Sequence, residues 1–369
     1  MKSRVVKVIQ SLSPAPDALI VLNSTDPHLD HSFFYFFDVP SGLFEGSVEV
    51  ALPDGTLHVI TSPLEEESAR QAAKHDPSVE VHAAAEKKDR ELLLQELAPK
   101  HGTVGIHNRE LTYEAFLQVD KWLPGTTWVD APAAIGKARG IKDAVEIERL
   151  ERAGAIGSAV GKQIPSMLRA GMSELDLAAE IEYGMMKHGA SGRSFSTITA
   201  FGAHGAEPHF SPGEQRLEGG VSLVCDFGAF YQRYASDITR SFHFGKTDPE
   251  LKRVHETVER AQKAALDVVR AGTPAKDVHM AAQRVIDDSP WKGRFTHGLG
   301  HSIGLAVHDG FGMNQRVEDP LEAGMTITIE PGIYLPGHGG VRIEDDILVT
   351  QNGYRFLTTT PREYIEVPA

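Results

Sequence analysis

The segment VSLVCDFGAFYQRYASDITRSFHFG, residues 221–245, contains two apolar β-type runs, and each run carries one aspartate, Asp226 and Asp237. Side chains alternate between the two faces of a strand with a period of two. Alternation therefore places Asp226 on the face of Ser222, and Asp237 on the face of Thr239. A buried pair of carboxylates needs a shared proton or a cation, because like charges repel. We expect this hairpin to form the floor of a site that holds such a partner.

Composition limits the classes of protein to which the chain can belong. With 369 residues and 41% hydrophobic content, it is expected to be a soluble protein of two or three domains. A net charge of −14 argues against nucleic acid and anionic membranes as partners. The single cysteine, Cys225, excludes an internal disulfide, fits a reducing cytoplasm and is expected to be packed in the core. No run has the length of a signal peptide or a membrane span, so we predict a cytoplasmic location.

The first part of the chain alternates apolar β-type runs with helical patterns, which is typical of an α/β layer domain. We predict this domain over residues 1–130. The aromatic run 33–37 is expected to be core. The segment 124–140 is rich in Pro, Gly and Ala, and we place the linker at 131–142. Strands are expected at 18–22, 47–52, 57–61, 79–83 and 103–106, and helices at 62–74, 86–98 and 108–123.

The remainder, residues 143–369, is predicted to be an α+β domain. Two amphipathic helix patterns cover 142–168 and 173–189, and Ser173 with Asp176 forms a capping box at the start of the second. A second helical pair is expected over 249–288, followed by strands near 325–334 and 341–350. Two helix pairs, each followed by strands, indicate a pseudo-repeated unit with its helices outside a curved sheet.

Four carboxylates occupy strongly apolar strands, where an unpaired charge is unfavourable. They are Asp226, Asp237, Glu330 and Glu344. Gathered at one point they would carry four negative charges, which two divalent cations would balance. A histidine from the stretch 297–310 would add the nitrogen ligand expected for Mn, Co, Zn or Fe. Two such ions can hold a hydroxide between them and stabilise a tetrahedral oxyanion, so the residues indicate a dinuclear metallohydrolase.

An ion-pair network without metal is the alternative for these carboxylates, but only Arg342 and Arg240 lie close in sequence. Histidines outside the site are expected to be structural. His204 and His243 are interpreted as hydrogen-bonded residues, and His255, close to Glu256 and Glu259, as part of a solvated helix face.

The spaced motifs DFG…SDITR, HGLGHSIGLAVHD, TIEPGIY and RIEDD resemble those of the creatinase/prolidase/aminopeptidase P family of pita-bread metallopeptidases. The resemblance covers the whole chain. It implies a creatinase-type α/β N-terminal domain followed by a pita-bread catalytic domain, and the segment KDAVEIERLERA matches the start of the latter.

The resemblance also implies a role for each site residue. Asp226 would bind the first metal ion, and Asp237 and Glu344 would bridge the two ions. His301 and Glu330 would complete the ligands of the second ion, and Glu330 would also act as general base. His308 and His209 would contact the substrate, Arg342 would orient the bridging carboxylate, and His297 would support the ligands from outside.

Members of this family differ in substrate. Prolidases cleave Xaa-Pro dipeptides, whereas aminopeptidases P cleave longer peptides that begin Xaa-Pro. Arg316 lies about where prolidases carry an arginine for the proline carboxylate, and this favours a dipeptidase. Two divalent ions per subunit are expected, with Mn as the metal and Co, Zn or Fe as alternatives. Aminopeptidase P is the alternative, and a metal-free creatinase-type hydrolase or an inactive peptide-binding scaffold is more remote. The resemblance further implies a homodimer in which the loop 27–31 caps a neighbouring subunit's site.

Overall fold

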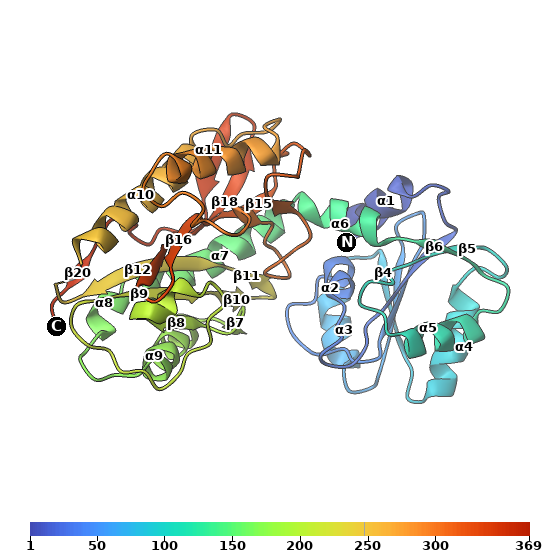
Figure 1. The fold of residues 1–369 in the computed structure, drawn as a ribbon. Helices are drawn as coiled ribbons and strands as arrows, with labels where there is room; N and C mark the ends of the chain where they lie inside the picture. Colours follow the sequence, from blue (N-terminus) through green and yellow to red (C-terminus); the bar gives the residue numbers. More distant parts are fainter. Residues whose placement is uncertain (247) are drawn as a thin grey trace. The chain divides into compact units, whose positions relative to one another are not determined.

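The computed structural model describes residues 1–246 and 248–369, which divide into two compact units, Met1–Arg139 and Gly140–Ala369 (Figure 1). The division falls inside the range predicted as a linker. Most of that range is helical, because α6 occupies Pro132–Gly140. Proline is favourable at the first position of a helix and alanine within it, and this explains why a stretch rich in Pro and Ala is ordered here.

The first unit contains a six-stranded mixed sheet with the strand order β4-β3-β2-β1-β5-β6. Strand β2 pairs with β1 and with β3, in both cases antiparallel. The parallel pairs are β3 with β4, β1 with β5 and β5 with β6. The strands predicted from β-type runs are all present, while β6 lies in the stretch 124–140 rich in Pro, Gly and Ala, where no strand was predicted. The bounds are β1 Ala18–Leu22, β2 Val48–Ala51, β3 Leu57–Thr61, β4 Val79–Ala83, β5 Thr103–Ile106 and β6 Thr127–Asp130.

Helices of this unit include two that the sequence pattern did not predict, α1 Lys2–Ser11 and α2 His31–Phe37. Helix α2 is capped by Asp30, whose side chain accepts a hydrogen bond from Ser32 N at 2.7 Å. Its aromatic residues are buried, as expected for a core cluster. The predicted helices are confirmed as α3 Glu66–Ala73, α4 Lys87–Leu97 and α5 Tyr113–Trp122.

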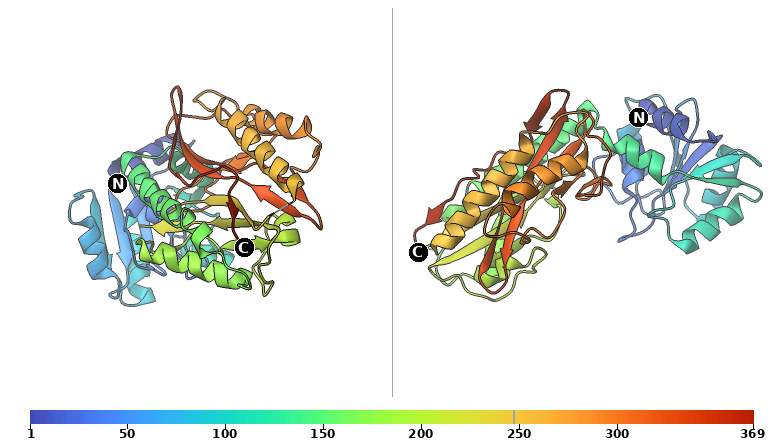
Figure 2. Two further views of the ribbon diagram at one scale, coloured as in Figure 1. Left: turned by 90° about the vertical axis from the view of Figure 1, so that its left-hand side faces the viewer. Right: turned by 45° about the horizontal axis from the view of Figure 1, so that its top comes forward.

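The second unit carries the two predicted helix pairs. Ser173 Oγ accepts from Asp176 N at 3.0 Å and Ser173 N donates to Asp176 Oδ2 at 2.8 Å, so the predicted capping box is present. Helices α10 and α11 lie side by side in both views of Figure 2. The bounds are α7 Ala144–Gly161, α8 Ile164–Met167, α9 Glu174–Lys187, α10 Pro249–Leu266 and α11 Ala275–Asp287. Across the described residues of both units, no helix combines the length and the apolar character that crossing a membrane requires.

Strands of the second unit form several small sheets. The hairpin of residues 221–245 is built by β9 Val221–Phe227 and β12 Ile238–Phe244, which are the central strands of the sheet β20-β12-β9-β8. Two short strands, β10 and β11, replace the simple turn expected between them. The remaining bounds are β7 Gly192–Arg193, β8 Ile198–Phe201, β10 Ala229–Tyr231, β11 Tyr234–Ala235, β13 Gly300–His301, β14 Gly312–Met313, β15 Thr326–Ile329, β16 Gly332–Leu335, β17 Gly339–Arg342, β18 Asp345–Thr350, β19 Gly353–Phe356 and β20 Glu366–Val367.

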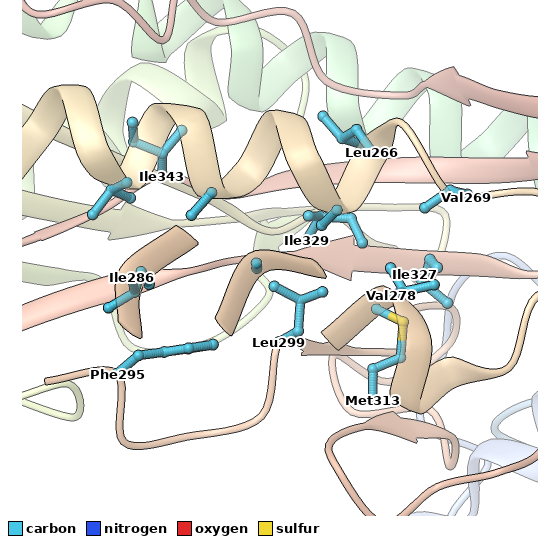
Figure 3. Close-up of a cluster of buried hydrophobic side chains, with 14 of the residues drawn as sticks. Leu266, Val269, Val278, Ile286, Phe295, Leu299, Met313, Ile327, Ile329 and Ile343 are labelled. Carbon is cyan, nitrogen blue, oxygen red and sulfur yellow. The ribbon is translucent and has the colours of Figure 1, made fainter. Parts of the chain in front are cut away.

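Each helix pair covers its own set of strands. Helices α7 and α9 pack on β8, β9 and β12, whereas α10 and α11 pack on β15 to β18. Figure 3 shows the second cluster, in which Ile327 and Ile329 of β15 lie among apolar side chains of α10 and α11. Because side chains alternate along β15, Thr328 and Glu330 face away from this core. The packing of the helices thus determines the side of the strands on which polar residues gather.

Candidate metal centre

Asp226 and Asp237 are brought together by the register of the central hairpin. Asp226, near the end of β9, lies opposite Thr239 of β12, and Asp237 directly precedes β12. Both aspartates are buried, with 9% and 5% exposure. The Oδ1 atom of each has no hydrogen-bond partner among the described residues. A buried carboxylate oxygen without a donor is unfavourable, so each of these atoms has unused capacity for a ligand.

Glu344 joins the aspartates from the break between β17 and β18. Its backbone N donates to Thr239 O at 3.1 Å, and its Oε2 accepts from Thr239 Oγ1 at 2.6 Å. Two residues further on, in β18, Asp346 Oδ2 accepts from the backbone N of Asp237 at 2.9 Å. These contacts attach the C-terminal strands to the hairpin, and they place the Glu344 carboxylate beside the two aspartates.

His301 and Glu330 complete the cluster from two further elements. His301 ends β13, and its Nδ1 lies 3.2 Å from Ser302 O, to which it can donate. That hydrogen bond leaves Nε2 with its lone pair free to bind a metal. Nε2 lies 3.6 Å from Asp237 Oδ2 and 3.5 Å from Glu330 Oε1. One ligand atom each from Asp237, His301 and Glu344 lie within 4.8 Å of one another.

The protonation of these side chains is strongly affected by their surroundings. Burial, with repulsion from Glu344, raises the pKa of Asp237 and of Glu330 well above the usual range. Burial, with repulsion from Asp226, raises the pKa of Glu344 to about 8. Burial lowers the pKa of His301 to about 4. Carboxylates that resist ionisation beside a neutral imidazole require either protons or a cation, and only a cation lets all of them ionise.

Arg342 is the buried cation of the cluster. Its Nη2 donates to Asp226 Oδ2 at 2.7 Å, its Nε to Thr239 Oγ1 at 3.0 Å and its Nη1 to Tyr334 Oη at 2.9 Å. From the resemblance we expected Arg342 to orient the bridging carboxylate, Glu344. Among the described residues its direct carboxylate partner is Asp226, and its hydrogen-bonded connection to Glu344 runs through Thr239.

Arg240, the other arginine considered for neutralising the site, is occupied elsewhere. Its Nη2 forms an ion pair with Asp345 Oδ1 at 2.7 Å. Its Nη1 donates to the backbone oxygen of Glu344 at 2.5 Å, and therefore not to the carboxylate. Strand alternation explains this, because Asp345 points to the opposite side of the chain from Glu344 and Asp346.

Tyr334 is a site residue to which we assigned no role from the sequence. This residue of β16 is buried, and its hydroxyl lies 2.8 Å from His297 Nε2 as well as accepting from Arg342. Burial raises the pKa of Tyr334 to about 12, so the phenol stays protonated. His297 lies with Nδ1 2.8 Å from Gly298 O and 3.9 Å from Glu330 Oε2, which places it beside the ligand cluster. The tyrosine belongs to the motif TIEPGIY, and its place in this motif is the sequence feature from which a role in the site could have been predicted.

The three predicted substrate residues are all exposed. His308 is exposed, and its ring centroid lies 4.2 Å from that of His301. His209 is exposed as well. The pKa of His308 is lowered mainly by partial burial of its imidazole ring and further by repulsion from the nearby His209. Arg316 is exposed between β14 and β15, and the structure records no side-chain interaction between it and the cluster among the described residues.

His204, His243 and His255 have structural partners, and the prediction about His255 is wrong. His255 does not belong to a solvated face: it is 1% exposed, with Nδ1 3.2 Å from His243 Nε2 and Nε2 2.9 Å from Arg362 O. It lies next to Val254 on the buried side of α10, whereas the neighbouring Glu256 is exposed. His204 Nδ1 lies 2.8 Å from Glu174 Oε1, as a hydrogen-bonded structural residue would.

The residues present fit divalent metal ions. Buried Oδ1 atoms of Asp226 and Asp237 without donors, the Nε2 lone pair of His301 and two further carboxylates form a mixed oxygen and nitrogen donor set. Such a set suits Mn, Co, Zn or Fe. The geometry is therefore that of a metal centre rather than of a closed ion-pair network.

Known proteins share this architecture. Residues 148–351 match metallopeptidase family M24, and residues 15–141 match the creatinase/prolidase N-terminal domain. An uncharacterised peptidase of Staphylococcus haemolyticus is 39% identical over 229 residues, which are 62% of this chain and 65% of that protein. The chain thus spans just under two thirds of the length of this relative.

Two solved structures are similar over nearly the full length. The Xaa-Pro dipeptidase from Bacillus anthracis has a TM-score of 0.89 at 30% identity, with 99% of each chain covered. The X-Pro aminopeptidase from Thermotoga maritima has a TM-score of 0.88 at 32% identity, with 95% of this chain and 98% of that chain covered. The second unit thus has the pita-bread fold and the first the creatinase-type fold, as expected, and this chain belongs to metallopeptidase family M24.

Proposed function

We propose that this metallopeptidase hydrolyses the Xaa-Pro bond of Xaa-Pro dipeptides with two divalent ions per subunit. The observation that carries the proposal is the convergence of Asp237, His301 and Glu344, whose ligand atoms lie within 4.8 Å of one another. Asp226 and Glu330 would complete the ligand set. Manganese is the proposed ion, and cobalt, zinc or iron would suit the same donors.

Each side chain of the centre would have a separate role in peptide hydrolysis. Bound ions would supply Lewis acidity toward the scissile carbonyl and lower the pKa of the attacking water. Glu330 would accept the proton of that water, since burial already raises the pKa of this carboxyl. His308 and His209, exposed beside the cluster, would hold the peptide, and Arg342 would fix Asp226 in position.

The choice of a dipeptide rests on Arg316. An exposed guanidinium between β14 and β15 can pair in a bidentate manner with a free proline carboxylate, which a longer peptide lacks. The solved dipeptidase and aminopeptidase are similar to this chain to nearly the same degree. Aminopeptidase P activity on longer Xaa-Pro peptides is therefore the second candidate. We also propose a cytoplasmic homodimer in which the loop 27–31 caps the neighbouring site, and light scattering would test the dimer.

Release of alanine from Ala-Pro and from Ala-Pro-Ala, after reconstitution with Mn²⁺ or Co²⁺, distinguishes the two activities. A dipeptidase cleaves Ala-Pro, and cleavage of the tripeptide alone would refute that assignment. Metal analysis should find close to two ions per chain, which separates this proposal from a metal-free hydrolase and from an inactive scaffold.

Substitution of a proposed bridging ligand tests the metal centre itself. Asp237→Asn keeps the size of the side chain and removes its charge, so we expect loss of both activity and bound metal. Asp267→Asn is the matched control, because Asp267 is 59% exposed at its side chain and pairs only with Lys263 among the described residues. Unchanged peptidase activity in Asp237→Asn would exclude the proposed centre.

A further inference from the structure

We propose that the N-terminal unit contains a separate metal site that binds one divalent transition-metal ion such as Zn²⁺. The site is formed by His58, Glu80 and His82. Each of these residues offers one ligand atom, and the three atoms lie within 4.8 Å of one another. The site belongs to the first unit, whereas all ligands of the proposed peptidase centre belong to the second.

The arrangement follows from the pairing of two parallel strands. His58 of β3 lies opposite Glu80 of β4, and Ile60 lies opposite His82. Residues two apart on a strand share a face, so all three polar side chains project from the same face of the sheet. Strand β4 is the edge of the sheet, which leaves the site accessible from one side.

The distances suit tetrahedral coordination. His58 Nδ1 lies 3.2 Å from His82 Nε2 and 3.4 Å from Glu80 Oε2. Zinc bonds to nitrogen and oxygen ligands are about 2.0–2.2 Å long, so two ligands at a tetrahedral angle are about 3.3 Å apart. Both distances from His58 are therefore those of two ligands of one ion, and the ligand atoms of Glu80 and His82 lie within 4.8 Å of each other. Two histidines with one glutamate are also a known zinc ligand set, with the fourth position left for water.

Exposure and charge around the cluster are compatible with entry of an ion. The His58 side chain is 10% exposed and forms the base of the site, while the Glu80 side chain is 59% exposed at its rim. Glu96 of α4 adds a negative charge near His82, and Arg70 of α3 adds a positive one. The alternative is a hydrogen bond between the two imidazoles with Glu80 as an additional acceptor, which needs no metal.

Zinc binding by the full chain distinguishes these interpretations. The chain is dialysed to equilibrium against buffered free Zn²⁺, and bound zinc per chain is compared for the wild type, His82→Gln and His75→Gln. His75 is an exposed histidine of the same unit, outside the cluster, and serves as the control. We expect His82→Gln to bind one ion fewer than the wild type and His75→Gln to bind the same number. The peptidase activity of Mn-loaded His82→Gln should stay at the wild-type level, and an unchanged circular dichroism spectrum shows that the substituted first unit is folded.

Glu80→Gln provides a second variant that does not disturb the core, because Glu80 is exposed. It should lower the affinity for zinc by more than roughly tenfold, because substitution of a residue that only supports a metal ligand already lowers metal affinity by about that factor. The zinc ion should persist in Asp237→Asn, so failure of the peptidase proposal would leave this result intact. Wild-type zinc content in His82→Gln, or wild-type affinity in Glu80→Gln, would show that the imidazoles form only a hydrogen bond.

Discussion

Arg342 and Asp226 form a buried ion pair, with Nη2 2.7 Å from Oδ2. The pair satisfies one oxygen of Asp226 and leaves Oδ1 without a protein donor among the described residues. A planar guanidinium reaches Asp226, Thr239 and Tyr334 at once. The arginine therefore orients one proposed ligand while its hydrogen bond to Thr239 connects it to Glu344.

Arg342→Lys should keep the charge and lose this geometry. A lysine ammonium cannot reproduce the fork that connects the three partners. We expect kcat/KM to fall by roughly 10- to 100-fold, together with weaker metal binding, as for other residues that support metal ligands. Steady-state kinetics against Mn²⁺ concentration would measure both. Arg355→Lys is the matched control, because Arg355 is exposed and pairs with Glu151; an equal loss in both variants would contradict this role.

Gly300→Ala should displace the proposed ligand His301. A Cβ at Gly300 would overlap with the backbone carbonyl of Thr328, so β13 would have to move away from β15. We expect loss of metal affinity and activity, measured by metal titration and peptide hydrolysis. Gly312 lies opposite His301, and a Cβ there meets no atom within 4 Å. Gly312→Ala should therefore retain activity, and full activity in Gly300→Ala would show that β13 tolerates the shift.

Stability of the metal-free protein should decrease as the pH rises above about 6.5. Burial, with repulsion from Asp226, raises the pKa of Glu344 to about 8. The Glu344 carboxyl then binds more protons in the folded state than in the unfolded state between about pH 5 and 8. Below about pH 6.5 the lowered pKa of the buried His301 has the opposite effect, so we expect stability to fall from about pH 6.5 to 8, at most by about 1.4 kcal/mol per pH unit for one group. Thermal unfolding after chelation would show the trend.

Two changes should weaken that dependence. Glu344→Gln is neutral at all pH values and should flatten the slope, and added Mn²⁺ should raise the stability most at the alkaline end, where the carboxylates ionise. A metal-free wild type that becomes more stable from about pH 6.5 to 8 would contradict the sign of the effect.

Arg316→Ala should separate the substrates. If the guanidinium binds the proline carboxylate, KM for Ala-Pro should rise by roughly tenfold or more, with little change for Ala-Pro-Ala, because a charged hydrogen bond is worth about 1.5–3 kcal/mol. Arg270→Ala is the control, since Arg270 is also an exposed arginine of the second unit. Equal effects of Arg316→Ala on both peptides would argue against a carboxylate-binding role.

Much of the candidate centre could be predicted from strand alternation. Asp226, Asp237, Glu330 and Glu344 stand out because each lies within an apolar strand or directly beside one, and a period of two is a local property of the chain. Tyr334 and His255 show where such reasoning fails. Whether the hydroxyl of Tyr334 meets Arg342, or which side of α10 is buried at His255, depends on elements far apart in the sequence.

The amino-acid sequence by itself determined the helix pairs and most strands, and it indicated the residues of the proposed peptidase centre, because propensity, capping and periodicity act over a few residues. Only the tertiary structure decided that Arg342 forms an ion pair with Asp226 and Arg240 with Asp345. It also decided that His58 and His82 share one face of the sheet with Glu80. These relationships depend on the register between strands, which the chain sets through long-range packing and hydrogen bonding.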